Sequence, residues 1–248
     1  MLLHGRTAII SGAARPCGIG LATARSSPST APAPLSSKWM NASRAEAISF
    51  GEELLGLACD ATGRDACQRA VDAVPRAIGC IDILINNAGI THPVKTMEID
   101  PTSWSAIIDV NLREVLYPSQ SVIPHMRQRE NGVDRLHVVG LCAAWRRSFR
   151  RAALRGGQSR RARFGQSHGA RTQFRRLPRQ LRRVGRIQTD ITSVKLTEAT
   201  KTEIIKGIPL SGLGEAREIA NIALLLASDL SAYGAGAVIG INEGMLVH

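Results

Sequence analysis

The residues best suited to chemistry are glycines that follow a short apolar run near the N-terminus. Residues 7–11 are mostly apolar or β-branched, and the stretch GAARPCGIG follows at residues 12–20, before an apolar helix start. A strand, a glycine turn and a helix in this order let the backbone approach a pyrophosphate, and the helix N-terminus favours an anion. A plain strand-to-helix turn can have the same residues. The turn therefore indicates a candidate phosphate site that needs support from other motifs.

Three further polar features follow or interrupt predicted elements. Asp60 ends a short strand over residues 55–59, and the segment NNAGI at residues 86–90 ends a buried strand over residues 81–85. Such small residues let the backbone lie against a ligand. Asn111 interrupts the apolar stripe of a long helix predicted over residues 101–126. A buried amide needs hydrogen-bond partners, so Asn111 is either a satisfied structural residue or part of a site.

The order of the predicted elements indicates how these features are positioned. Helices are expected over residues 64–78 and 215–228, and a last strand over residues 237–241. Strands alternating with helices predict a parallel sheet covered on both faces, and the length fits one large α/β domain or two small ones. Ligands of such sheets bind at the carboxyl ends of the strands. The glycine turn, Asp60 and the asparagine segment all belong to those ends.

Length and composition exclude several classes of protein. The chain has 248 residues, of which 44% are hydrophobic, so it can bury a sizeable core and is not intrinsically disordered. It has no run of about 18 apolar residues and no recognisable signal peptide, so we expect a protein of the cytoplasm with no membrane partner. Its five scattered cysteines form no CxxC pair, which predicts reduced thiols and no metal site.

The net charge of +12 is unevenly distributed. Residues 133–186, the arginine-rich segment, hold 16 arginines, no lysine and one acid, Asp134, which gives 16 − 1 = +15. The other 194 residues carry 16 basic against 19 acidic residues, or −3. Such a segment suggests nucleic-acid binding through phosphates. Its three phenylalanines are too irregularly spaced for a stacking platform, so nucleic acid is an unexpected partner.

Taken together, the motifs resemble the short-chain dehydrogenase/reductase family, in particular its 3-oxoacyl-acyl-carrier-protein-reductase-like members. Residues 11–20 resemble the TGxxxGIG cofactor turn with two extra residues, and residues 86–89 are the NNAG motif. Residues 109–112 match the segment with the catalytic-site asparagine. Residues 185–189 resemble the end of the PGxIxT segment, and LASD and NEGM near the C-terminus resemble the family's LASD and NGG endings.

The resemblance implies a single domain over residues 1–248 with a doubly wound α/β Rossmann fold and a mostly seven-stranded parallel sheet. It implies an NAD(P)-dependent oxidoreductase that interconverts a carbonyl and a secondary alcohol of a small-molecule substrate by hydride transfer, working as a homodimer or homotetramer. Asn111 would hold a water of the proton relay, and Asp60 would meet the adenine. The cofactor-binding residues that it implies are Ser11, Gly12, Arg15, Gly18, Ile19, Gly20, Asp60, Asn87, Ala88, Gly89, Ile187 and Thr189.

The family's catalytic serine and its YxxxK pair are missing from this chain. The family chemistry uses a tyrosine as general acid/base, with a lysine four residues later that lowers its pKa. The only tyrosines here are Tyr117 and Tyr233, and neither has a lysine four residues on, so both are interpreted as packing residues. The chain as written predicts no turnover. An inactive family member serving as a subunit is the alternative.

Two stretches, residues 26–50 and 133–183, depart from the family and look frameshifted. With codons chosen within degeneracy and shifted by one base, residues 138–145 can read SSVSAQR and residues 153–171 can read HYAAAKAGVLGLAKAMAR. That reading contains the missing serine region and YxxxK. In the other shifted frame, residues 26–41 can read FAKHGARAAVIEMDE, a second strand ending in an acid, which favours NAD over NADP. The hypothesis is two compensated frameshifts, from sequencing error or gene decay.

Overall fold

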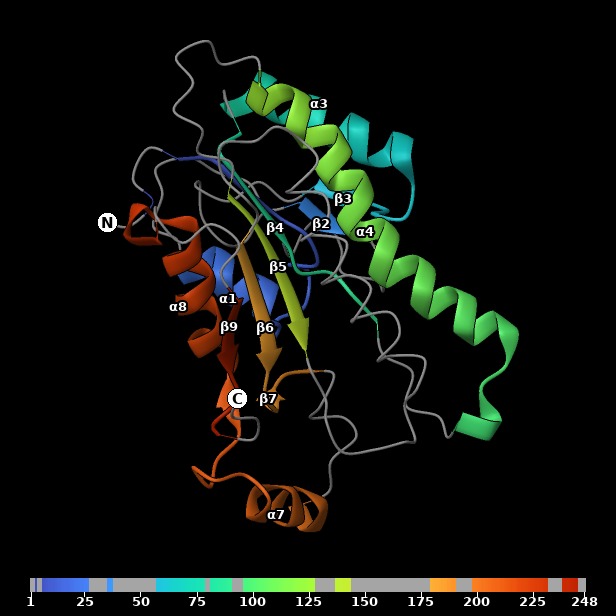
Figure 1. Ribbon diagram of the computed structural model, residues 1–248. Helices are drawn as coiled ribbons and strands as arrows, with labels where there is room; N and C mark the ends of the chain where they lie inside the picture. The colour runs from blue at the N-terminus through green and yellow to red at the C-terminus, as the bar shows by residue number, and fades with distance from the viewer. Residues whose placement is uncertain are drawn as a thin grey trace.

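A computed structural model describes Leu3 and residues 6–26, 35–37, 57–78, 81–90, 96–127, 137–143, 179–190, 198–231 and 238–244. Strands and helices alternate along the chain (Figure 1). The strands are β1 (Ala8–Ile10), β2 (Leu35–Ser37), β3 (Leu57–Cys59), β4 (Ile83–Asn86), β5 (His137–Ala143), β6 (Arg179–Val184), β7 (Ile187–Gln188), β8 (Gly214–Glu215) and β9 (Val238–Ile241). The α-helices are α1 (Ile19–Ser26), α3 (Arg64–Ile78), α4 (Pro101–Arg127), α7 (Glu198–Lys206) and α8 (Ala216–Ala227), and short 3-10 helices cover Thr96–Glu98 and Asp229–Ser231.

Five parallel strands form the central sheet in the order β1-β4-β5-β6-β9. β2 pairs only with β3, and β7 only with β8, as two small parallel sheets. The parallel α/β fold is as predicted, but the described residues do not confirm one sheet of seven strands. β2 and β3 are three residues each, and β2 contacts β1 without joining its hydrogen-bond ladder.

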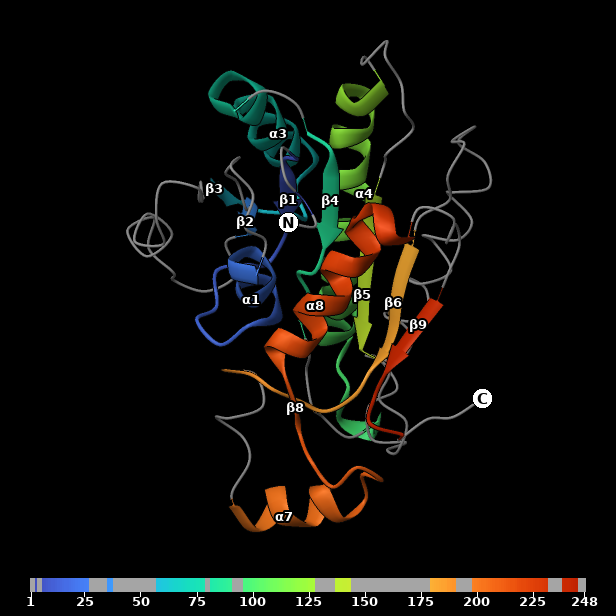
Figure 2. The ribbon, with the colours of Figure 1, turned by 90° about the vertical axis from the view of Figure 1, so that its left-hand side faces the viewer.

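Helices lie on both sides of this sheet (Figures 1 and 2). α1 packs against α8 on one side, and α3 packs against α4 on the other. The strands alternate their side chains between the two layers. Ile10 and Ile83 are buried with α1 and α8, whereas Ile9 and Leu84 are buried with α3 and α4. Continuous apolar strands are therefore stable here because both faces are covered.

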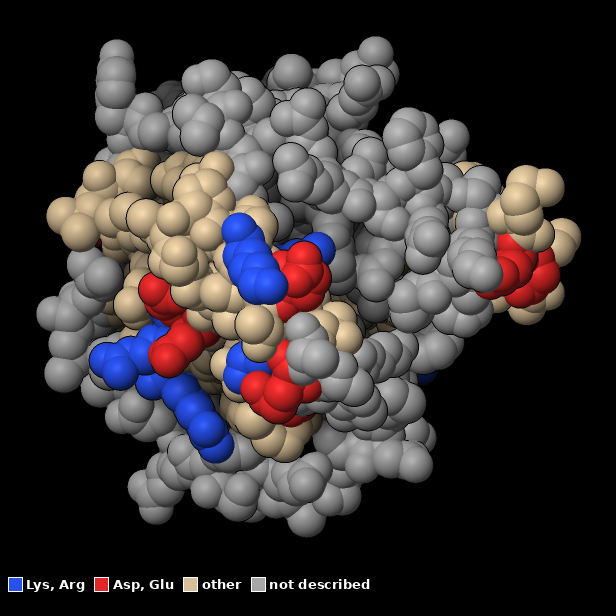
Figure 3. Space-filling view, turned by 90° about the horizontal axis from the view of Figure 1, so that it is seen from below, with Lys and Arg blue, Asp and Glu red and all other residues tan. Residues whose placement is uncertain are grey.

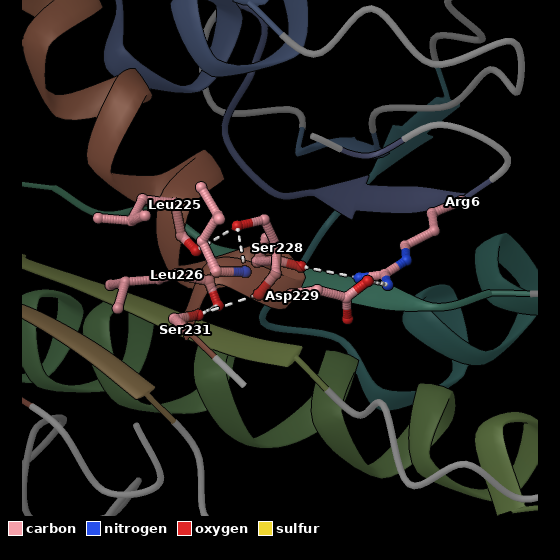
Figure 4. Close-up of polar contacts among 8 residues, drawn as sticks. Arg6, Leu225, Leu226, Ser228, Asp229 and Ser231 are labelled. Carbon is pink, nitrogen blue, oxygen red and sulfur yellow. Dashed lines mark hydrogen bonds and ion pairs between the residues drawn. The ribbon is translucent and has the colours of Figure 1, made fainter. Parts of the chain in front are cut away.

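A buried arginine joins the start of β1 to the end of α8 (Figure 4). The Arg6 guanidinium donates to the Ala227 carbonyl at 3.3 Å and forms an ion pair with Asp229 Oδ2 at 2.5 Å. Ser228 and Ser231 cap the last turn of α8, because their hydroxyls donate to the Leu225 and Leu226 carbonyls. The Arg6 contacts hold the segment before β1 against the end of α8, and Arg6 and Asp229 are 223 residues apart in sequence.

Most predicted elements agree with the observed ones. The helix expected over residues 64–78 is α3, and those expected over residues 101–126 and 215–228 are α4 and α8 within two residues at each end. α8 starts at a capping box in which the Glu218 carboxylate accepts from the Glu215 amide at 2.7 Å. Asp100 accepts from the Ser103 amide and hydroxyl at the start of α4, and these hydrogen bonds lower the pKa of Asp100.

The arginine-rich segment contributes two interior strands to the central sheet, β5 and β6. β2 lies within residues 26–41, the stretch for which a shifted reading supplies a second strand. Residues 27–34, 38–56, 128–136 and 144–178, which make up most of the two departing stretches, lie outside the described residues.

Among the described helices, none combines the length and the apolar character needed to cross a membrane.

Candidate functional site

The structure brings the glycine turn and the asparagine segment together through one buried hydroxyl. β1 and β4 are parallel neighbours, so Ser11 and Asn87 lie at the same edge of the sheet. Ser11 Oγ accepts from the amides of Asn87 and Ala88, both at 3.0 Å. The Asn87 side-chain amide donates to the carbonyls of Ser11 and Gly12, at 2.9 and 3.1 Å. These four hydrogen bonds make the two segments one rigid unit.

Two glycines allow this close approach. Gly12 has φ +69°, and a Cβ at this position would lie 2.6 Å from the Ala88 Cα. A Cβ on Gly20 would lie 2.5 Å from the Asn87 side-chain nitrogen and 2.7 Å from the Gly12 carbonyl oxygen. A side chain at either position would push the turn off the asparagine segment.

The second half of the turn leads directly into α1. The Gly18 amide donates to the Arg15 carbonyl at 3.0 Å, and the Gly18 carbonyl accepts from the Ala22 amide as the helix begins. Arg15 and Ile19 are half-buried. The amides of the first turn of a helix have no partner within the helix, which makes this end suited to an anion.

The segment around β7 approaches the same turn from the far end of the chain. Ile187 and Thr189 are both buried. Cys17, in the middle of the turn, donates its amide to Asp190 Oδ2 at 3.0 Å. The Asp190 carboxylate also accepts from the Cys17 thiol, and this hydrogen bond together with the negative charge raises the pKa of Cys17. Nothing in the sequence analysis singled out Asp190, because its partner is 173 residues away.

A close approach near β9 positions the β7 segment. The Gly185 amide donates to the Ile241 carbonyl, and a Cβ on Gly185 would lie 2.8 Å from the Asn242 Cα. Ile187 itself fills the space beside Gly214, where a Cβ would lie 2.6 Å from its side chain.

Asp60 serves its own loop. The residue is exposed, and its Oδ1 accepts from the Thr62 amide at 2.9 Å and from the Thr62 hydroxyl at 2.7 Å. The Gly63 amide donates to the Asp60 carbonyl, so the loop turns into α3 here. These bonds give Asp60 a structural role, and its predicted contact with an adenine remains a prediction.

Asn111 is a satisfied buried residue. It is 1% exposed, and its side-chain amide donates to the Ile90 carbonyl at 3.0 Å and to the Ile107 carbonyl at 2.8 Å. The first bond ties α4 to the segment after β4. Gly89, in that segment, is half-buried. The role of Asn111 in a proton relay stays a prediction.

The other titratable groups of the sequence analysis have packing roles. Tyr117 is half-buried against the core between α3 and α4, as predicted. The Nε2 of His125 lies 3.0 Å from Asp72 Oδ1 and so joins α4 to α3. Tyr233 lies outside the described residues. A hydrogen bond with Cys59, together with burial, raises the pKa of the buried Cys67 thiol.

Cys17, Cys59 and Cys67 are free thiols. Among the described residues, no group of histidine, cysteine and acidic side chains could hold a metal ion.

A glycine turn between the first parallel strand and a helix, at the carboxyl edge of an α/β sheet, is the arrangement of nucleotide-binding doubly wound proteins. The short-chain dehydrogenase family model matches residues 6–133 of this chain. An uncharacterised short-chain type dehydrogenase/reductase, y4mP of Sinorhizobium fredii, is 44% identical over 260 aligned positions that cover all of both chains. The chain belongs to the short-chain dehydrogenase family, and thus to a family of oxidoreductases.

Relatives named 3-oxoacyl-[acyl-carrier-protein] reductase FabG are also similar. That of Thermotoga maritima is 32% identical and covers all of both chains, and that of Escherichia coli is 29% identical with 99% of both chains covered. The family-model match ends at residue 133, where the arginine-rich segment begins.

Proposed function

We propose that this protein binds NAD(P) at the turn after β1 and derives from enzymes that interconvert a carbonyl and a secondary alcohol. The observation that carries the proposal is the unit formed by Ser11, Gly12 and Asn87, because it fixes the turn against the edge of the sheet where such cofactors bind. The substrate class is a small-molecule ketone or 3-oxoacyl thioester, in line with the names of the relatives.

The residues present fit a dinucleotide by the shape of the backbone. Gly12 and Gly20 leave no room for side chains where the turn meets the Asn87 segment, and the turn opens into α1. Under the proposal, Ser11, Gly12, Arg15, Gly18, Ile19 and Gly20 hold the phosphates and Asp60 the adenine end. Asn87, Ala88, Gly89, Ile187 and Thr189 line the path to the nicotinamide, which would accept or supply a hydride when bound.

Among the described residues, no tyrosine lies where it could protonate the carbonyl oxygen, and the sequence contains no YxxxK pair. Asn111 donates both of its side-chain hydrogens to backbone carbonyls, so its amide orients the segment after β4 and moves no proton itself. The described tyrosine, Tyr117, lies in the core between α3 and α4. We therefore propose cofactor binding without turnover for this chain, with NAD favoured over NADP and a homodimer or homotetramer as the assembly.

The missing tyrosine and lysine belong, in this proposal, to the gene in its original frame. Two features support the frameshift: the family match ends at residue 133, and the shifted reading of residues 153–171 contains YxxxK. Resequencing the gene across the codons for residues 20–50 and 128–190 tests this directly. Single-base corrections that restore YxxxK are the expected result, and an unchanged sequence in both stretches would contradict a sequencing error.

Cofactor binding is tested separately by titrating the purified chain with NADH and NADPH and following the nicotinamide fluorescence. Saturable binding of either, with no oxidation of the cofactor in the presence of acetoacetyl thioester, is expected. A folded chain that binds neither would overturn the proposed function.

The second candidate function for the chain as written is that of an inactive family member serving as a subunit. It rests on the packed helical layers α3 and α4, which are formed without the missing residues. Where Figure 3 shows described residues, basic side chains lie beside acidic ones. On α7, Lys206 forms an ion pair with Glu203 at 3.2 Å, and this mixture of charges on the described surface gives a nucleic-acid partner no support.

A further inference from the structure

Asp190, the residue directly after Thr189, is linked to the glycine turn at Cys17. Asp190 Oδ2 accepts from the Cys17 amide at 3.0 Å, and the Cys17 thiol donates to the same carboxylate. The link joins two segments that both belong to the proposed cofactor site. It rests on the proposed function, because its consequence is read out through the cofactor.

The chemistry of this link is that of an anion on a backbone amide. The turn before a helix attracts negative charge through its N–H groups and the helix dipole. In this structure, the carboxylate of the chain itself is the anion that one of these amides contacts. Its charge also opposes any second anion brought to the same turn, since like charges a few ångströms apart repel.

The position of Asp190 is set by the segment directly before it. Thr189 is buried directly before it, and β7 is held against β8 by the backbone pairing of Ile187 with Gly214. The Gly214 amide also donates to the Arg186 carbonyl at 3.0 Å. The carboxylate therefore starts from a fixed backbone and reaches the turn with one short side chain.

We propose that Asp190 is an internal competitor of the cofactor phosphates, and that it lowers the affinity of this protein for NAD(P). A dinucleotide must displace the carboxylate from the Cys17 amide before its pyrophosphate takes the turn. The contact is exposed, so water and salt weaken it and the expected effect is moderate, about threefold to tenfold in affinity.

The test compares the full chain with Asp190→Asn and Asp190→Ser, which remove the charge and keep a polar side chain. Calorimetric titration with NAD, ADP-ribose and adenosine gives the affinities. Both variants should bind NAD and ADP-ribose about threefold to tenfold more tightly, while adenosine, which has no phosphate, should not change. Glu203→Gln is the matched control, because it removes one negative charge on α7 and should leave every affinity unchanged.

The outcomes separate the two proposals. If the wild type binds NAD and both Asp190 variants bind it equally or more weakly, the role of Asp190 is overturned. The proposal that the protein binds the cofactor then still stands. If the wild type and both variants are folded by circular dichroism and none binds NAD or ADP-ribose, both proposals are overturned. An equal gain for adenosine also contradicts the inference, because it would show that the phosphates are not what Asp190 opposes.

Discussion

β4 and β6 are both interior strands of the same parallel sheet, yet their sequences differ sharply. β4 reads ILIN and all four of its residues are buried. β6 reads RQLRRV, with β5 on one side, β9 on the other and α8 against it. An interior parallel strand usually reads as a continuous apolar run, because helices cover both faces. β4 follows that rule and β6 does not.

The difference shows that a segment can pair as an interior strand of this sheet although its amino-acid sequence is not typical of one. β6 pairs in parallel with β5 and β9, at Leu181 with Leu141 and with Ile239, and each of the two ladders contains one register shift. Its sequence contains three arginines, a residue type that interior parallel strands rarely contain. A frameshift in an otherwise ordinary gene would produce such a strand, which has the position of an interior strand but residue types that are untypical of one.

The largest expected effect comes from restoring the frame over residues 26–50 and 133–183, which would remove the contrast between β4 and β6. The restored chain should reduce an acetoacetyl thioester or simple ketone with NADH at a measurable rate, and the chain as written should not. Replacing the tyrosine of the restored HYAAAK segment by phenylalanine should lower kcat by about 100-fold or more. Steady-state assays by NADH absorbance check this. A restored chain that folds and binds NADH but shows no turnover on any ketone tested would contradict the frameshift hypothesis.

The second largest effect is expected at the glycine turn, which packs on the segment after β4 and lies outside the two stretches that look frameshifted. Gly12→Ala places a Cβ 2.6 Å from the Ala88 Cα at a φ of +69°, so we expect a loss of about 2–4 kcal/mol of stability and no cofactor binding. Chemical denaturation and NADH titration measure both. Gly63→Ala is the control, since its nearest contact is 3.5 Å and it should change stability by about 0.5 kcal/mol or less. Equal effects at the two glycines would mean that the turn is not packed as described.

The third effect concerns the link between β1 and α8, which holds the intact regions together. Arg6→Met keeps the apolar stem and removes the hydrogen bonds to the Ala227 carbonyl and Asp229. We expect a loss of about 1–3 kcal/mol, because the Arg6 side chain is only 9% exposed. Thermal unfolding measures the loss. Asp229→Asn should cost less, since it keeps an oxygen acceptor and its side chain is 59% exposed. A larger loss for Asp229→Asn than for Arg6→Met would be inconsistent with this interpretation.

The smallest effect depends on pH and lies at the end of β9, next to β6. Partial burial and the charge of Glu218 raise the pKa of Glu243, which also has φ +51°. The folded state therefore carries an energetic penalty above the raised pKa, and this penalty disappears as the pH falls through it. Glu243→Gln should therefore raise the melting temperature at neutral pH, with a gain of less than about 1 kcal/mol in the free energy of unfolding. This gain should vanish near about pH 4.

Glu203→Gln, on the exposed face of α7, is the control for the pH series. If the stability gain of Glu243→Gln grew as the pH fell, the pH dependence would have the wrong sign. Ionised Glu243 would then not be what destabilises the folded state.

Much of the fold could be predicted because local patterns were strong. α3 and α8 follow from apolar residues at helical spacing, and β4 follows from the run before Asn86. The pairing of β2 with β3 outside the main sheet could not be predicted, because strands of three residues carry too little pattern to fix their neighbours. For the candidate site, parallel strands predicted that the glycine turn and the asparagine segment share one edge of the sheet, and Ser11 and Asn87 are in contact there. That these residues and Asp60, which bonds its own loop, bind a cofactor stays a prediction.

The sequence by itself determined the family, the order of strands and helices and the absence of YxxxK, because these depend on residue types and on spacing along the chain. Only the tertiary structure decided which distant groups touch. The Asp190 carboxylate on the Cys17 amide, Arg6 on Asp229 and His125 on Asp72 each join residues that no local pattern relates. Such contacts arise from the packing of whole elements, since a side chain finds its partner only after the sheet has brought remote segments to one edge.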